Sequence, residues 1–144
     1  MESRAPRLIL EYAPFGSPLD ASQVTAISAE EDLEILRQNL SALRYLHERR
    51  DAIVHREIRL GNILVQSRDP LHIKLSDFGF SKEKEDSMKT HVGTNFYAAP
   101  EIAARKSYGP SLDIWSLGMV IFQFAHGLPD YNRVWVNQYL DGLP

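Results

Sequence analysis

The chain has 144 residues, 44% of them hydrophobic, a length that suits one structural unit with an ordinary buried core. Its formal charge of -3 provides no net basic surface for nucleic acid or anionic membranes, and the absence of cysteine excludes disulfides and thiolate metal sites. No apolar window approaches the roughly 18 residues of a membrane helix, and the first apolar run is too short for a signal peptide. We therefore expect a soluble intracellular protein, cytoplasmic or nuclear, that binds neither nucleic acid nor membranes.

The first apolar segment, from Leu8 to Tyr12, is followed by Pro14, Gly16 and Pro18. A short apolar run that stops at turn residues is typical of a strand entering a loop. The sequence therefore predicts a strand and then a loop or linker.

The clearest predicted helix runs from about Ala29 to Arg49. Ser28 and Glu31 have the spacing of a capping box, in which each side chain bonds the other's backbone. Apolar positions then recur at spacings of three and four, at Leu33, Leu36, Leu40, Leu43 and His47. This spacing predicts a stripe packed on a core.

Three brief β-branched segments follow, at Ala52 to Val54, Ile63 to Val65 and Ile73 to Leu75. Their composition and flanking polar residues predict short strands that frame loops. From Ser81 to Asn95 the sequence is polar without an apolar period, which predicts a mobile surface loop.

A second helix is predicted from Leu112 to Ala125. Its residues are apolar almost all round, which is expected of a helix buried on every side, and Gly127 and Pro129 then supply a stop signal. The segment from Tyr131 to Pro144 has the length of one more short helix.

Polar residues gather in the loop from His55 to Asn62, which carries a carboxylate, two guanidiniums and an amide between two predicted strands. Fifteen residues after Asn62 comes Asp77-Phe78-Gly79, where the glycine lets the backbone turn. An amide oxygen and a carboxylate that converge are hard ligands suited to Mg²⁺. Each of these features also has a simpler interpretation when it is considered alone. Asp77 to Gly79 would be an ordinary turn, His55 would be a structural histidine, and Arg56 would be a surface ion-pair partner.

The order and spacing of these residues resemble protein kinases. His55-Arg56-Glu57 matches the first two positions of the His-Arg-Asp catalytic motif, Asn62 falls at the metal-binding asparagine, and Asp77-Phe78-Gly79 matches the magnesium motif. Thr94 to Glu101 resembles the segment ending in Ala-Pro-Glu that receives the peptide substrate. Asp113 to Gly118 resembles the buried-helix motif, whose aspartate holds backbone amides of the catalytic loop. Both segments resemble those of Ser/Thr kinases.

The resemblance implies an α+β fold, the C-terminal lobe of a kinase, mostly helical with short strands around the catalytic loop. Residues 1–18 correspond to the last N-lobe strand and the hinge, and residues 19–144 to the C-lobe. We expect the N-lobe to be absent, with its Gly-rich loop and phosphate-binding lysine, and the C-terminal helices to be truncated.

The resemblance also implies ATP and Mg²⁺ as cofactors. Leu10 corresponds to the gatekeeper, and Glu11, Ala13 and Leu64 to residues that contact the nucleotide. Asn62 and Asp77 would hold the metal.

Among the residues implied for catalysis, Glu57 stands where the family has aspartate, and Arg59 where Ser/Thr kinases favour lysine. The extra methylene of Glu57 is expected to impair catalysis, because a displacement of about 1 Å can cost on the order of 10²-fold. Thr94 would lie in the substrate groove. For regulation, phosphorylated Thr90 would pair with Arg56 and Lys82, the alternative being that Thr90 is one hydroxyl in a solvated loop.

Two functions follow from the resemblance. The first is the family reaction, transfer of the ATP γ-phosphoryl group to a protein Ser or Thr, weak or absent in the isolated chain. The second is a pseudokinase or protein-binding module that uses the C-lobe surface, including apolar faces left bare by the missing parts.

Overall fold

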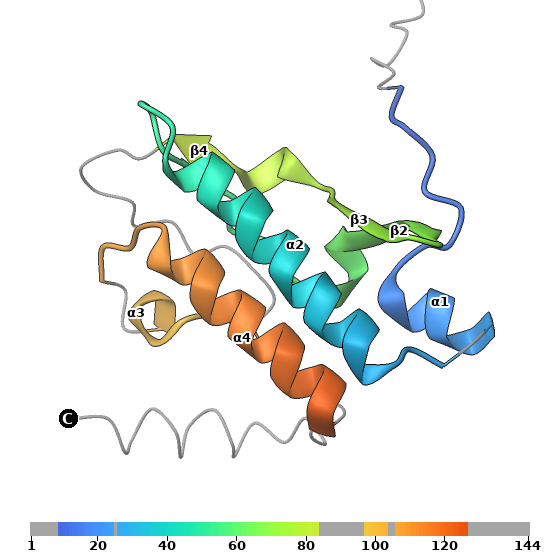
Figure 1. Cartoon of the computed structure of the whole chain (residues 1–144). Coiled ribbons are helices and arrows are strands. Elements are labelled where there is room, and N and C mark those ends of the chain that lie inside the picture. The colour runs from blue at the N-terminus through green and yellow to red at the C-terminus, as the bar shows by residue number, and fades with distance from the viewer. Residues whose placement is uncertain (1–8, 25, 84–96, 104–105, 127–144) are drawn as a thin grey trace, which may run out of the picture.

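The computed structural model describes residues 9–24, 26–83, 97–103 and 106–126. In chain order the elements are α1 (Pro18–Val24), α2 (Ala29–His47), β1 (Ile53–Val54), β2 (Ile63–Arg68), β3 (Leu71–Leu75), β4 (Lys82–Glu83), α3 (Pro100–Ala103) and α4 (Ser111–His126). Single 3₁₀ turns span Leu60–Asn62 and Phe78–Phe80. Helix α2 contacts α4 on one side and the β2–β3 hairpin on another, so it forms the centre of the fold (Figure 1). The mixture of helices and small antiparallel sheets agrees with the predicted α+β class.

Helix α2 begins as the sequence predicts. Ser28 Oγ accepts the N–H of Glu31 at 3.2 Å, and Glu31 Oε2 accepts the N–H of Ser28 at 2.9 Å, which completes the capping box. The guanidinium of Arg68, on β2, also donates to both carboxylate oxygens of Glu31, at 2.6 and 2.7 Å. The first turn of α2 is therefore fastened to the hairpin as well as capped.

The buried face of α2 differs from the predicted stripe. Its fully buried residues are Ile35, Asn39 and Leu43, whereas Leu33 is 67% exposed and Leu40 is 42% exposed. The buried positions repeat every four residues, as expected for one face of a helix, and α2 packs against both α4 and β3. The leucines alone did not reveal that a buried position is occupied by an asparagine.

Helix α1 differs from the loop or linker that the sequence predicts after Tyr12. Ser17 and Asp20 form a second reciprocal cap: the Ser17 N–H donates to Asp20 Oδ2 at 2.8 Å, and the Asp20 N–H donates to Ser17 Oγ at 3.3 Å. Pro18 follows the cap, at a helix position where its missing N–H costs nothing. The signal was present in the sequence.

The strand predicted at the N-terminal end is wrong for its described residues. Residues 9–12 have no regular secondary structure, and Ile9 and Leu10 are 94% and 71% exposed. A strand needs a neighbour to pair its backbone groups, and none of the described strands forms a ladder with this segment. The described residues of the segment therefore belong to neither of the two described sheets.

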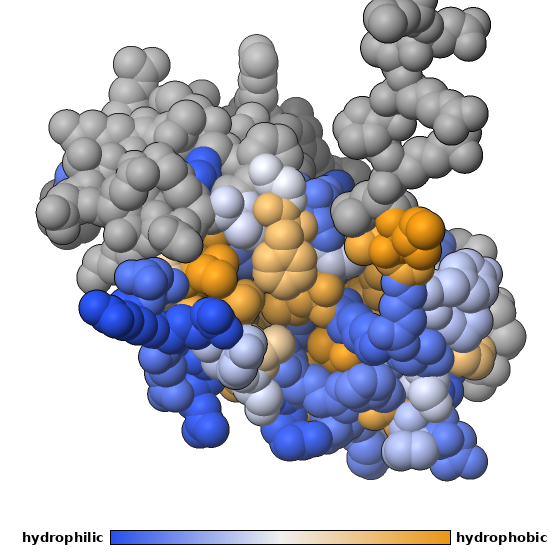
Figure 2. All heavy atoms as spheres, turned by 90° about the horizontal axis from the view of Figure 1, so that it is seen from above, coloured by the Kyte–Doolittle hydropathy of each residue, from blue (hydrophilic) through white to orange (hydrophobic). Residues whose placement is uncertain are grey.

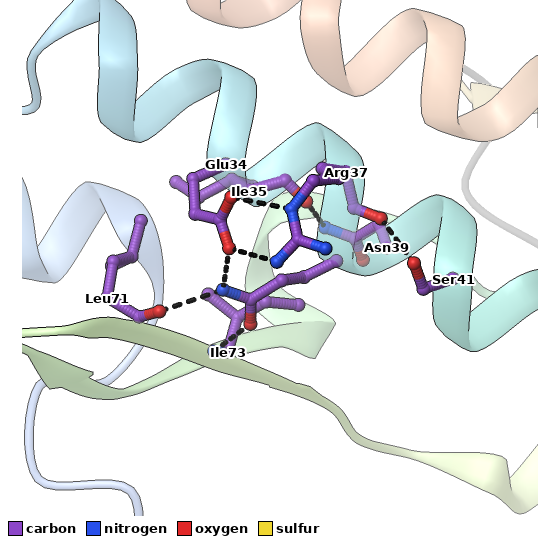
Figure 3. A network of polar contacts seen from close by, with 8 residues as sticks. Glu34, Ile35, Arg37, Asn39, Ser41, Leu71 and Ile73 are labelled. Carbon is purple, nitrogen blue, oxygen red and sulfur yellow. Dashed lines mark hydrogen bonds and ion pairs between the residues drawn. The ribbon is translucent and has the colours of Figure 1, made fainter.

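The three predicted internal strands are confirmed. β2 and β3 form an antiparallel hairpin in which Ile63 faces Leu75 and Leu64 faces Lys74. β1 pairs with β4 through Val54 and Lys82. Helix α2 also provides hydrogen-bond partners for backbone groups of β3. The Gln38 side chain donates to Leu71 O at 2.8 Å and accepts the Ile73 N–H at 2.9 Å (Figure 3).

Helix α4 has the predicted position but not the predicted burial on every side. Leu117 and Val120 are buried in the core, while Ile114 is 47% exposed and Phe122 is 38% exposed. An open hollow of about 540 Å³ lies along the exposed face, lined by Ser111, Ile114, Trp115, Gly118 and Met119. A helix whose residues are apolar on every face can be buried on all sides or can leave one apolar face exposed, and its sequence alone does not distinguish the two cases.

Apolar side chains are also exposed elsewhere on the molecule. Figure 2 shows apolar residues in the middle of the upper face, bordered by hydrophilic ones. Large apolar residues with substantial exposure in the described ranges include Ile9, Leu10, Tyr12, Tyr45 and Phe78. None of the helices in those ranges has the length and apolar character needed to cross a bilayer.

Candidate functional site

The polar loop between β1 and β2 is hydrogen-bonded to Asp113, which lies at the start of α4. Asp113 is fully buried, and its two carboxylate oxygens accept the N–H groups of His55 and Arg56, each at 2.8 Å. This is the role that the sequence predicted for Asp113. The Nε2 atom of His47, at the end of α2, lies 2.7 Å from the same carboxylate. One carboxylate thus joins both long helices to the loop.

Arg56 has a backbone conformation that is unusual for a residue with a side chain. Its φ is 74°, in the left-handed region, and such a conformation costs on the order of 1–3 kcal/mol. The hydrogen bond from its N–H to Asp113 holds it there. Strained backbone that the surroundings enforce clusters at functional sites.

Glu57, Arg59 and Asn62 form one connected group. The Glu57 side chain is 10% exposed, and its Oε2 lies 3.6 Å from Arg59 Nε and 3.4 Å from Asn62 Nδ2. Asn62 Nδ2 also donates to the backbone carbonyl of Glu57 at 2.8 Å. The carboxylate therefore faces a cation and an amide within its own loop.

Asn62 and Asp77 lie at the same end of the β2–β3 hairpin. The carbonyl of Asn62 accepts the N–H of Ser76 at 2.8 Å and its hydroxyl at 3.1 Å, which brings the residue before Asp77 against Asn62. Asp77 has a φ of 60° and is exposed, and it accepts the Gly79 N–H at 3.3 Å.

The donor set at this end of the hairpin fits Mg²⁺. Because the amide nitrogen of Asn62 bonds Glu57, its side-chain oxygen is the atom suited to a cation, and the exposed carboxylate of Asp77 follows directly after the residue that bonds Asn62. Mg²⁺ prefers such oxygen ligands and takes few of them from protein. In the described ranges no group of three His, Cys, Asp or Glu residues could hold a metal ion, so a site here is a sparse one.

His55 joins the two halves of the site. Its Nε2 lies 3.1 Å from the carbonyl oxygen of Ser76, and its ring lies 4.6 Å from the ring of Phe78. Burial lowers the pKa of His55, although the charge of Asp113 opposes the shift. A neutral, buried imidazole between the loop and the Asp77 segment acts as a structural link, which agrees with the simpler reading of this histidine.

The residues predicted to contact the nucleotide lie near the hairpin. The carboxylate of Glu11 pairs with Lys74, which faces Leu64 across β2 and β3. Ala13 belongs to a turn that docks on β2, since its carbonyl accepts the Gly16 N–H at 3.3 Å and Gly16 O accepts the Val65 N–H at 2.7 Å. The structure therefore places Glu11 beside β3, and Ala13 and Leu64 in or next to β2.

The predicted regulatory and substrate residues are only partly covered. Arg56 is 8% exposed, and the backbone of Lys82 pairs with Val54, but the side chain of Lys82 is outside the described part. Thr90 and Thr94 lie outside the described residues.

Two residues of the site were missed at the sequence level. His47 was placed in an apolar stripe, although a histidine at a core position signals a polar partner. The Tyr97 hydroxyl bonds Gln123 Oε1, and the Tyr97 carbonyl accepts Ser116 Oγ at 2.8 Å. Burial raises the pKa of Tyr97. These contacts anchor the segment before α3 on α4.

The model of the protein kinase domain family matches residues 2–139. The chain belongs to this family. Among curated kinases, it is 38% identical over 127 residues to the serine/threonine-protein kinase STE20 of Candida glabrata and 39% identical to pakA of Talaromyces marneffei. It is 35% identical to the serine/threonine-protein kinase PAK 1 of Mus musculus. Each alignment covers 86% of this chain but only 13%, 19% and 23% of the respective relative, so the kinase chain spans a small part of their length.

Proposed function

We propose that this chain is the C-terminal lobe of a Ser/Thr protein kinase domain, whose reaction is transfer of the ATP γ-phosphoryl group to a protein hydroxyl. The observation that supports the proposal most is that Asn62 bonds Ser76, the neighbour of Asp77, and also bonds Glu57 in the loop that carries Arg59. The names of the relatives support the Ser/Thr class. ATP, Mg²⁺ and a protein substrate follow from the family.

In this proposal Asn62 and Asp77 hold Mg²⁺ through their oxygens, and the ion neutralises phosphate charge when it is bound. Arg59 supplies a further positive charge near the transferred group. Glu57 accepts a hydrogen bond from the substrate hydroxyl and orients it. Phosphoryl transfer depends mainly on this positioning and on electrostatic stabilisation.

Glu57 is the residue that weakens the proposed enzyme. Its carboxylate is largely buried and is shared between Arg59 and Asn62, so it must leave these partners to reach a substrate hydroxyl. We propose that the chain turns over slowly or not at all. Glu57→Asp should raise the rate in any kinase assembly that contains this lobe, and an unchanged rate would show that Glu57 is not the limiting residue.

Regulation by phosphorylation belongs to the same proposal. Phosphorylated Thr90 would pair with Arg56, and with Lys82 as a second cation. Phosphate adds close to two negative charges and three acceptor oxygens, enough to order a loop against a guanidinium. Arg56→Ala should then expose phosphorylated Thr90 to a phosphatase faster than in the parent chain.

Calorimetry tests the proposed metal–nucleotide site. The purified chain is titrated with ATP in the presence and absence of Mg²⁺, beside the Asp77→Asn variant, which keeps the shape but removes the charge. Mg²⁺-dependent binding that is lost in Asp77→Asn supports the proposal. Equal binding by both proteins, or none by either, contradicts it.

A second candidate function is a protein-binding module without catalysis. It is favoured by the exposed apolar residues of α4: Ile114, which lines an open hollow, and Phe122. Apolar patches of this kind mark interaction surfaces or aggregation sites. Failure of the ATP titration, with the chain folded, would favour this candidate over the enzyme.

A further inference from the structure

Arg56 is a buried cation for which the described residues supply no anion. It is 8% exposed, its Nε atom has no hydrogen-bond partner, and no described carboxylate forms an ion pair with it. Arg59, three residues later, does pair with Glu57. Buried charges are costly unless they are paired, so a guanidinium that has no anion among the described residues is suited to receive one.

The ring of Tyr108 lies against this guanidinium. The Cζ atom of Arg56 is 5.7 Å from the centroid of the ring, within the range in which the face of an aromatic ring attracts a cation. Tyr108 is 9% exposed and packs in a small core with Val54, Ala99, Ile102 and Leu112. That core fixes the position of the ring.

The backbone and the guanidinium of Arg56 are therefore both held in place. Asp113 fixes its strained backbone through the N–H, and Tyr108 fixes the guanidinium from the side. The face of a ring attracts a guanidinium through its charge and offers it no oxygen acceptor. A guanidinium presents these donors as a planar fork that matches two phosphate oxygens.

We propose that Tyr108 is a positioning residue that holds the Arg56 guanidinium ready for a phosphate group. The inference rests on the proposed function, in which Arg56 receives phosphorylated Thr90, and it adds the residue that keeps Arg56 in place while the phosphate is absent. A phosphorylated residue and free inorganic phosphate offer the same oxygens, so both are tested.

The first experiment titrates the whole chain with inorganic phosphate and follows the Nε–H resonance of Arg56 by ¹⁵N NMR. Tyr108→Phe keeps the ring, and its affinity should stay within about twofold of the parent. Tyr108→Leu keeps apolar volume but removes the ring, and it should bind phosphate about 3- to 30-fold more weakly. The Nε–H resonance should also lose the shift caused by the ring. Equal affinity of the Leu variant and the parent would overturn the proposal.

A second series decides the question if Tyr108→Leu does not fold. Phenylalanines with one to three ring fluorines at position 108 keep the shape of the ring while they weaken its negative face. Phosphate affinity should fall in steps with the number of fluorines. An affinity that stays constant across the series would show that the ring acts only by packing, and would overturn the proposal.

The source of the phosphate is tested with chain that carries phosphothreonine at position 90. If this residue is the ligand, the Arg56 Nε–H resonance is shifted without added phosphate, free phosphate no longer binds, and Tyr108→Leu reverses the shift. If free phosphate still binds equally well, the ligand is the free ion and Tyr108 keeps its role. Absence of binding in both forms refutes the proposal, whereas Mg²⁺-dependent ATP binding tests the kinase proposal separately.

Discussion

Nε2 of His47 and Oδ2 of Asp113 lie 2.7 Å apart, and the same Oδ2 accepts the backbone N–H of His55. The His47 side chain is 13% exposed, so the contact is largely shielded from water. His47 therefore helps to orient the carboxylate that holds the backbone of His55 and Arg56.

We expect His47→Phe to lower the free energy of unfolding by about 1–3 kcal/mol, because it leaves a buried carboxylate with one partner fewer. His47→Gln, which keeps a donor, should cost less. Urea unfolding of the three proteins measures the difference. Equal stability of His47→Phe and the parent would mean that the two backbone N–H groups satisfy Asp113 alone.

Two neighbouring amides on α2 should respond in opposite directions to replacement by leucine. Asn39 is fully buried and its Oδ1 has no partner, although its Nδ2 donates to Ile35 O at 2.8 Å (Figure 3). Asn39→Leu removes an unsatisfied buried acceptor and should be neutral or stabilising, by up to about 1 kcal/mol. Gln38→Leu leaves Leu71 O and Ile73 N–H unpaired and should cost about 1–3 kcal/mol. Thermal unfolding compares them, and a larger loss for Asn39→Leu would contradict this prediction.

The pair formed by Glu31 and Arg68 predicts a dependence of stability on pH. The hydrogen bond from Arg68 is the main cause that lowers the pKa of Glu31 below its ordinary value of 4.5. A carboxylate with a lowered folded-state pKa contributes stability above 4.5, and this stability is lost as the pH falls through the folded-state pKa. Glu31→Gln should therefore be less stable than the parent at neutral pH, and the difference should shrink in acid.

Melting temperatures measured from pH 7 down to pH 3 check this prediction. Glu48→Gln is the matched control, because Glu48 has an exposed carboxylate 3.8 Å from Arg44 and caps the end of α2 through its backbone N–H, which the substitution keeps. If the melting temperatures of the two variants change with pH in the same way, the pair of Glu31 and Arg68 makes no specific contribution to stability.

Helix α4 has a buried side and an exposed side, so the same kind of substitution on each side should change the stability by different amounts. Leu117 is 2% exposed, and Leu117→Ala should cost about 2–5 kcal/mol through the cavity it creates. Ile114 is 47% exposed, and Ile114→Ala should cost no more than about 0.5–1 kcal/mol. Urea unfolding of both variants is the measurement. Similar losses would mean that Ile114 is covered in solution.

Local patterns account for what the sequence predicted well. The capping box at Ser28, the hairpin and the polar loop each depend on residues close together in the chain, so their spacing carries the information. The predicted convergence of Asn62 and Asp77 follows from hairpin pairing, which places residues that flank the two strands side by side.

Contacts between distant segments account for what the sequence did not reveal. His47 meets Asp113 across 66 positions, and nothing near either residue specifies that pairing. The buried face of α2 depends on where α4 and β3 pack, which leucine spacing cannot determine alone. The exposed side of α4 likewise reflects what its neighbours leave uncovered. Helix α1 is different, because Ser17, Pro18 and Asp20 carried a local signal that was overlooked.

The closure of the hairpin by Asn62 and Ser76 also bears on the order of folding. These residues are 14 positions apart, so the two predicted metal-binding residues can be brought together by a short-range step. The bonds from Asp113 to His55 and Arg56 span 58 and 57 positions and require the long helices to dock first. Because short loops close at a lower entropic cost, the end of the hairpin that carries Asn62 and Ser76 should form early during folding, and the strained Arg56 backbone should be fixed only in the last steps.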